Sequence, residues 1–239
     1  SPYVKDAFHA FVVEGNVAAV NSAQVGTMAA AHYRLEVGAG ETVAVRLCLT
    51  DTPHATGPFA VFDKTIDARR KEADEFYRAC TPDSACDDTA GVMRQAFGGL
   101  FWTKQYYFFD VNMWLREHGV HPLDAPASVP IRNRSWFHML NDDVISMPDK
   151  WEYPWYAAWD LAFHAVALAG VDPDFAKHQL NLMLKARYQH SNGQLPAYEW
   201  NFGDVNPPVH AWATIQLYLF DKERRGGGDI EFLKYAFAK

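Results

Sequence analysis

The spacing of the apolar residues changes once along the chain, and this change limits the folds available to it. In the first fifty residues apolar and polar residues alternate, as in HYRLEV (32–37) and ETVAVRLCLT (41–50), which flank the loop Gly38-Ala39-Gly40. Alternation around a short glycine-containing loop predicts a β-hairpin with one buried face. KDAFHAFVVEG (5–15) is a further strand candidate. We therefore expect antiparallel strands over residues 1–53.

From Phe62 onward the apolar residues recur at helical spacing instead. FDKTIDARRKEADEFYRAC (62–80) has apolar residues on one face and charged residues on the other, which predicts an amphipathic helix. A second helix is expected to begin after Asp83 or Ser84 and to carry on towards Tyr107. Further helices are predicted over residues 155–170, 174–190, 208–222 and 228–238, with Asp174 and Asp229 near helix N-termini.

A block of strands followed by a block of helices indicates two domains or an α+β arrangement, because alternating βαβ units are missing from the pattern. The expected organisation is a strand domain over 1–53, a linker with a connecting helix over 54–84, and a helical domain over 85–239. The fold class is mainly α. The chain begins and ends inside predicted secondary-structure elements, so we expect it to be a piece of a longer polypeptide.

Composition argues against several partners. The net charge of −7 and the absence of a basic stripe disfavour nucleic acid and anionic membranes, which are bound through clustered Lys and Arg. The three cysteines match no zinc or redox spacing, and no apolar run of membrane-spanning length or secretion signal is visible, so a cytoplasmic location is expected. No nucleophile, phosphate-loop or HExxH motif occurs, and we expect neither a metal nor a cofactor.

Two segments combine aromatic rings with polar side chains directly before an apolar helix. They are RNRSWFHMLNDDVISMPDKWEYPWYAAWD (132–160) and HSNGQLPAYEWNFGDVNPPVHAWA (190–213). Aromatic rings stack on the apolar faces of a pyranose, and carboxylates and amides pair with its hydroxyls. Long loops inside a compact domain are usually functional. The pattern therefore indicates a carbohydrate site built from both loops.

Individual residues in these loops also admit structural roles. Trp155 and Trp159 are spaced as a pair on one helix face, which fits a core as well as a pocket. Asp160 lies inside an apolar helix, so its carboxylate must be exposed or paired, and His164 is a possible partner, although the commoner role of such a histidine is in the core. Glu199 fits a salt bridge at the rim or a ligand contact equally well.

Two motifs in these loops resemble glycoside hydrolase family 63. YPWYAAWDLAFH (153–164) is similar to the first signature of that family, and GQLPAYEWNFGDVNPPVHAWA (193–213) resembles the second loop of its bacterial members, including the mannosylglycerate-hydrolase-like group. The resemblance implies an (α/α)6 toroid, of which residues 85–239 would form the first half. It also implies that the N-terminal strands are the end of an antiparallel β-sandwich.

The resemblance further implies an inverting glycosidase that acts on an α-linked glucoside or mannoside. In the family the Asp of the Trp-Asp signature, here Asp160, binds the sugar in the −1 subsite, while the general acid and base lie in later motifs, expected beyond Lys239. The catalytic residues thus stay unknown, with Asp160 the best candidate in this chain. The expected substrate-binding residues are Trp155, Trp159, Asp160, Tyr198, Glu199, Trp200 and Asn201.

Two alternatives stay open. The chain could be a non-catalytic carbohydrate-binding or scaffolding protein, in which the toroid serves recognition alone. A terpene-cyclase-like enzyme is less favoured, because its metal candidate, Asp142-Asp143, is expected in a loop or capping position rather than at an Asp-rich helix end. The expected partners are an oligosaccharide or small glycoside, together with the remainder of the same polypeptide or further copies of the chain.

Overall fold

The computed structural model describes residues 3–51, 57–124, 126, 130–131, 134, 136–150, 152, 154–199, 204 and 206–239. The described residues are mainly helical, and they contain a single two-stranded sheet. The chain divides into two compact units, Ser1–Ile66 and Asp67–Lys239. None of the helices in the described ranges is long and apolar enough to cross a membrane.

The first unit differs from the strands predicted for it. Residues Ala7–Val13 form helix α1, followed by a short 3-10 helix over Val17–Ala19, so the strand predicted over 5–15 is wrong. Residues 32–37 and 41–50 form no strand either. Their alternating apolar side chains, such as Leu35 and Leu47, are exposed. A lone two-stranded hairpin is at best marginally stable. Within the described part of the first unit no layer covers residues 32–50, so the predicted hairpin would have no core to pack on.

The predicted helix over 62–80 is confirmed as α2, Phe62–Cys80. The next helix, α3, covers Asp87–Trp102, so it begins after Cys86 rather than after Asp83 or Ser84. It also stops short of Tyr107. The hydroxyl of Thr103 donates to the carbonyl oxygen of Leu100 at 2.6 Å and so satisfies a carbonyl of the last turn. The aromatic run that follows favours a strand.

That run forms strand β1, Lys104–Asp110, which pairs antiparallel with β2, Leu140–Ser146. The register joins Lys104 to Ser146 and Asp110 to Leu140. A short helix, α4, Val111–Glu117, follows β1 directly. Asp142 and Asp143 therefore lie in a strand, which corrects the loop or capping role expected for them. The sheet was not anticipated because its two strands are separated by a long connection, so no hairpin signal joins them.

The outer edge of β2 is satisfied by a side chain instead of a third strand. Gln179, which is fully buried, accepts a hydrogen bond from the backbone N–H of Ser146 at 3.2 Å. Its amide nitrogen donates to the carbonyl oxygen of Val144 at 3.1 Å. Buried backbone groups need partners, so this one glutamine fixes the sheet to the helix that carries it.

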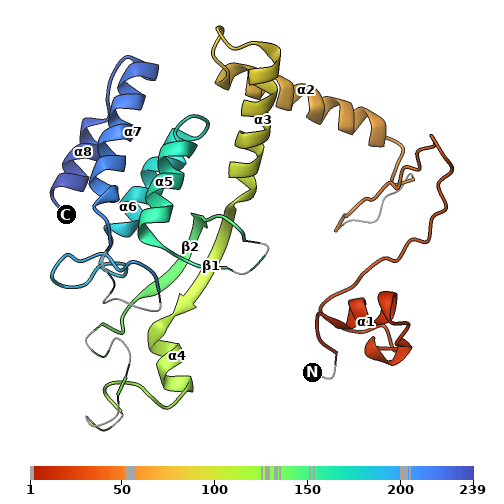
Figure 1. The fold of residues 1–239 in the computed structure, drawn as a ribbon, viewed down its shortest axis with the longest axis horizontal. Coiled ribbons are helices and arrows are strands. Elements are labelled where there is room, and N and C mark those ends of the chain that lie inside the picture. The colour runs from red at the N-terminus through yellow and green to blue at the C-terminus, as the bar shows by residue number, and fades with distance from the viewer. Residues whose placement is uncertain are drawn as a thin grey trace. The chain divides into compact units, whose positions relative to one another are not determined.

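Four helices form the C-terminal layer beside this sheet, as Figure 1 shows. They are α5, Ala158–Leu168; α6, Pro173–Met183; α7, Val209–Arg225; and α8, Ile230–Phe237. All four predicted helices are confirmed, with ends that differ by a few residues, except that α6 ends at Met183 rather than at residue 190. The side chains of Asp172 and Asp229 cap α6 and α8 by accepting from the N–H groups of Phe175 and Phe232.

Helix α5 is the centre of this layer, because it packs against α3, α6, α7 and β2. Its inward face is apolar and fully buried, and α6 supplies a matching face. The core residues with no or almost no exposed surface include Leu161, Ala162, Ala165, Leu168, Leu180, Leu182 and Met183. This packing fixes α5, so the side chains of its first turn have defined positions.

Candidate functional site

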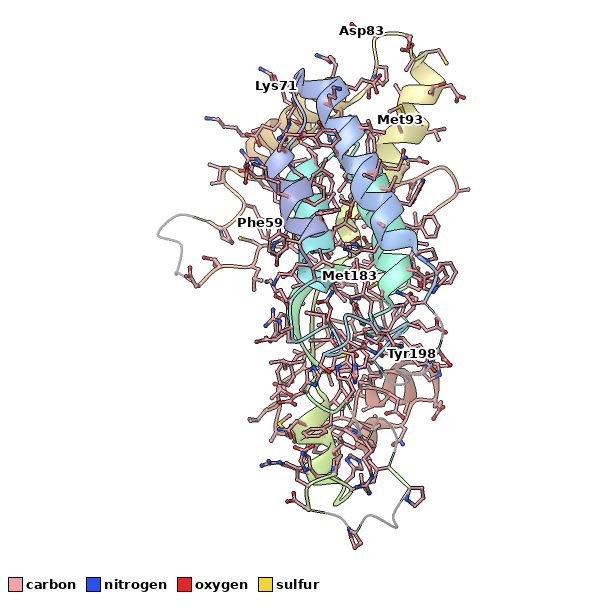
Figure 2. The ribbon with its side chains drawn as sticks, turned by 90° about the vertical axis from the view of Figure 1, so that its left-hand side faces the viewer. Phe59, Lys71, Asp83, Met93, Met183 and Tyr198 are labelled. Carbon is pink, nitrogen blue, oxygen red and sulfur yellow. The ribbon has the colours of Figure 1, made fainter. Side chains whose placement is uncertain are left out.

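A cavity of about 510 Å³ opens beside the first turn of α5. It is bounded by three segments that lie far apart in the sequence: strand β1, the residues leading into α5, and the end of the second aromatic loop. The lining residues are Tyr107, Phe109, Pro154, Trp155, Ala157, Trp159, Asp160, Ala197, Tyr198 and Glu199. Figure 2 labels Tyr198 in the loop region below the helices.

Backbone bonds tie the two aromatic loops together at this cavity. The N–H of Ala158 donates to the carbonyl oxygen of Ala197 at 2.9 Å. Ala157 and Tyr198 form an isolated antiparallel bridge. Two segments forty residues apart in the sequence thus form a short ladder, and their side chains enter one cavity for that reason.

Glu199 adds a side-chain bond to this connection. Its carboxylate accepts from the N–H of Tyr156 at 3.1 Å, and only 6% of the residue is exposed. Burial raises the pKa of the Glu199 carboxyl, while backbone N–H groups and the Tyr107 hydroxyl oppose that rise by binding the charged form. Glu199 is therefore a buried, well-partnered carboxyl at the cavity wall, and it holds the loop against α5 and β1.

Asp160 is placed differently. It lies in the first turn of α5 and is half-buried. Burial raises the pKa of its carboxyl, and the nearby His164 partly offsets this. The position near a helix N-terminus favours the anionic form. Asp160 is thus the more accessible of the two cavity carboxyls and the one better placed to meet a ligand.

The aromatic residues form the walls. The indole N–H of Trp155 donates to the carbonyl oxygen of Pro148 at 3.0 Å, which fixes the plane of the ring. Trp159 is 41% exposed, and Tyr198 is half-buried. Trp159 also makes an edge contact with Phe163, at 6.0 Å between ring centroids. Trp159 is therefore not a core residue, whereas Trp155 is partly buried and packs against the core as well as lining the cavity.

The structure brings five of the predicted site residues into one cavity. These are Trp155, Trp159, Asp160, Tyr198 and Glu199. Trp200 and Asn201 lie outside the described residues. Glu199 is buried in the cavity wall rather than exposed at a rim, and no salt bridge to it is found in the described part of the chain.

Strand β1 supplies two lining residues that the sequence interpretation missed. Tyr107 and Phe109 alternate along the strand and face the cavity, whereas Tyr106 and Phe108 are exposed. The signal was available in the run KQYYFFD, which is rich in aromatic strand formers. It was attributed to the end of a helix instead.

No group of metal-ligating side chains is found among the residues that the structure describes. Asp142 and Asp143, the metal candidates of the sequence, bind other side chains instead. Asp142 accepts from the hydroxyl of Tyr106 at 2.5 Å, and Asp143 pairs with Arg187 and accepts from the hydroxyl of Tyr188. Successive strand residues point to opposite faces, so the two carboxylates do not converge on one ion.

Comparison with known proteins agrees with the motifs. Residues 153–238 match the family described as the mannosylglycerate hydrolase MGH1-like glycoside hydrolase domain. This part of the chain is similar to that glycoside hydrolase domain. The match begins just before the cavity residues of α5 and ends in α8, so it contains both aromatic loops as far as they line the cavity. The resemblance seen in the sequence is confirmed.

A relative is also known in yeast. The uncharacterized protein YMR196W of Saccharomyces cerevisiae is 44% identical over 250 residues, which cover 100% of this chain and 23% of the yeast protein. The chain thus spans less than a quarter of the length of that relative. No solved structure matches the chain.

Proposed function

We propose that this chain provides the sugar-binding part of an inverting glycoside hydrolase that acts on an α-linked glucoside or mannoside. The observation that carries the proposal is the cavity in which Asp160 lies among Trp155, Trp159 and Tyr198, within a segment of glycoside hydrolase type. The cavity would be the −1 subsite. Trp200 and Asn201 complete the proposed set of ligand contacts.

The chemistry of the cavity fits a pyranose. Its volume of about 510 Å³ lies in the range of small-molecule sites. The indole of Trp155, fixed by its bond to Pro148, offers a rigid apolar face for the C–H groups of a sugar ring. The carboxylate of Asp160 accepts hydrogen bonds from sugar hydroxyls, and such a charge-assisted bond contributes about 1.5–3 kcal/mol.

The different surroundings of the Asp160 and Glu199 carboxyls indicate different roles for them. An inverting hydrolase needs one group that protonates the leaving oxygen and another that activates water. Glu199 already accepts from Tyr156 and Tyr107 and stabilises the cavity wall. Asp160 is assigned to the sugar hydroxyls. We therefore assign both proton transfers to carboxylates in another part of the complete enzyme.

The same proposal covers the architecture. In it, helices α5 to α8 belong to the first part of an (α/α)6 toroid whose centre holds the cavity. The exposed apolar side chains of residues 32–50, which form no strand here, would be covered by a further part of the complete protein. The long yeast relative is compatible with both extensions.

Calorimetric titration of the 239-residue chain with methyl α-glucoside, methyl α-mannoside and their α-linked disaccharides tests the function. Asp160→Asn should weaken binding about 10- to 150-fold, the loss of about 1.5–3 kcal/mol. Asp142→Asn is the matched control, because Asp142 lies in β2 outside the cavity. Equal affinities for wild type and Asp160→Asn would contradict the proposal, as would hydrolysis of an α-glycoside by this chain alone.

A further inference from the structure

A series of hydrogen bonds runs from the end of α3, through the end of β2, to the middle of α5. Thr103 donates to the carbonyl oxygen of Leu100 at 2.6 Å. The hydroxyl oxygens of Thr103 and Ser146 are 2.7 Å apart. The hydroxyl oxygen of Ser146 is in turn 3.1 Å from Nδ1 of His164. Ser146 is fully buried at the end of β2, so no solvent-exposed group competes for these bonds.

Counting the hydrogens in this series of hydrogen bonds fixes the direction of each bond. A hydroxyl carries one hydrogen and two acceptor lone pairs. The hydrogen of Thr103 is used by Leu100, so the contact between Thr103 and Ser146 requires Ser146 to donate. The hydrogen of Ser146 is then used as well. Ser146 therefore accepts from His164, and Nδ1 of His164 carries a hydrogen.

This assignment leaves Nε2 as the nitrogen of His164 that binds or releases a proton. His164 lies one turn after Asp160 on α5. Side chains on a helix lean towards its N-terminus, so the ring of His164 is inclined towards the turn that carries Asp160. The ring is held on its Nδ1 side by the hydroxyl of Ser146 on β2, so a further proton is taken up at Nε2.

We propose that His164 is a positioning residue of the sugar site, which takes up a proton at Nε2 and thereby holds Asp160 as an anion. The role rests on the proposed function of Asp160. Protonated His164 carries both N–H groups, so the bond to Ser146 is kept in both charge states. The ring can therefore change charge without turning, and Asp160 keeps its place at the cavity.

Asp160 and His164 each shift the pKa of the other, so the two groups are electrostatically coupled. Burial lowers the pKa of His164 and Asp160 raises it, while His164 lowers the pKa of Asp160 against the effect of burial. Among the described residues no charged side chain of α3, α6, α7 or β2 shifts either pKa. Glu199 and Tyr107 line the same cavity. The neighbours on β2 and α6, Ser146 and Gln179, are uncharged.

Nitrogen-15 NMR of histidine-labelled protein tests the first half of the proposal. The neutral ring of His164 should show a protonated Nδ1 and an unprotonated Nε2, and acidification should protonate Nε2. In Ser146→Ala the Nδ1 hydrogen loses its acceptor, and the ring should become a mixture of both tautomers. A wild-type ring that carries its hydrogen on Nε2 would overturn the proposal.

Carbon-13 titration of the Asp160 carboxyl tests the second half. His164→Asn is the informative variant, because the asparagine amide can still donate to Ser146 from near the position of Nδ1 but cannot be protonated. The pKa of Asp160 should be higher in His164→Asn than in wild type, while His178→Asn, which alters another residue of the described chain, should leave it unchanged. An unchanged pKa of Asp160 in a folded His164→Asn protein would overturn the proposal.

Sugar titrations separate this inference from the function it rests on. Wild type should bind the α-glycosides, and His164→Asn should lose affinity chiefly below neutral pH, where Asp160 is no longer held as an anion. If the pKa of Asp160 responds to His164→Asn but wild type binds no sugar, the function fails while the charge coupling stands. If both proteins bind equally across the pH range, the positioning role fails while the function stands.

Discussion

Replacing Glu199 tests whether the second aromatic loop is held by one buried carboxyl. In Glu199→Leu the buried N–H of Tyr156 loses its acceptor. The hydroxyl of Tyr107 loses the same acceptor, so the loss of one donor is a lower bound on the effect. One buried, unsatisfied donor costs about 1–3 kcal/mol of unfolding free energy. Glu199→Gln keeps an acceptor oxygen in the same place and should be at least as stable as wild type at neutral pH.

The pH dependence distinguishes these variants further. Burial raises the pKa of Glu199 above its ordinary value of 4.5, so the folded state holds the extra proton more tightly than the unfolded state does. The contribution of Glu199 to stability is therefore greatest at low pH and declines as pH rises from about 4.5 through the raised folded pKa. In Glu199→Gln this decline should disappear.

Urea unfolding followed by tryptophan fluorescence at several pH values between 4 and 8, a range set by the ordinary carboxyl pKa, measures both effects. The informative quantity is the difference in unfolding free energy between Glu199→Leu and Glu199→Gln at one pH, because both variants remove the charge. Equal stability of the two variants would refute the claim that the carboxyl holds Tyr156 and the loop. If the unfolding free energy of Glu199→Gln changed with pH as that of wild type does, the claim that the buried Glu199 carboxyl titrates in this range would be refuted.

Three further changes probe the same layer. Asp160→Asn should impair turnover of the complete enzyme by roughly 2–4 kcal/mol of transition-state binding, seen as a fall in kcat/KM, because contacts with the distorting sugar strengthen as charge develops. Gln179→Leu should lower the unfolding free energy by about 2–5 kcal/mol, since it orphans the N–H of Ser146 and a neighbouring carbonyl; calorimetric unfolding measures this. Lys177→Met should cost roughly 1–3 kcal/mol, since it removes a bond that the buried Asp221 shares with Lys177, and chemical unfolding at neutral pH measures the loss.

The helices were predicted well from the sequence because each has a signal within its own short stretch of residues. The run 62–80 has one apolar face, and Asp174 and Asp229 lie near helix N-termini as expected, Asp229 as the cap itself. A helix satisfies its own backbone hydrogen bonds whether or not its apolar face is covered, as α2 shows with no buried residue. Local information is therefore sufficient for such an element.

Strands depend on partners, and here the sequence failed in both directions. The alternation over 32–50 predicted a hairpin, but no covering layer lies within its unit, and the apolar side chains are exposed. Conversely, β1 exists because it pairs with the distant β2, whose other edge is satisfied by the side-chain amide of Gln179. Neither relation is visible in a short window of sequence.

The site was predictable in its residues and not in its roles. The aromatic and acidic composition of the two loops indicated a shared cavity, and the structure places Asp160 and Glu199 there. Their different burial depends on the ladder between residues 156–158 and 197–199, which fixes Glu199 against Tyr156. The contribution of Tyr107 depends on the sheet and was missed for the same reason as the sheet itself.

A crystal structure of the protein with a bound α-glucoside or α-mannoside tests the central claim most directly. We expect one sugar ring in the cavity, stacked on the indole of Trp155 or Trp159, with a hydroxyl donating to the carboxylate of Asp160. A ligand bound at another surface, or a ring in the cavity whose hydroxyls leave Asp160 untouched, would contradict the account.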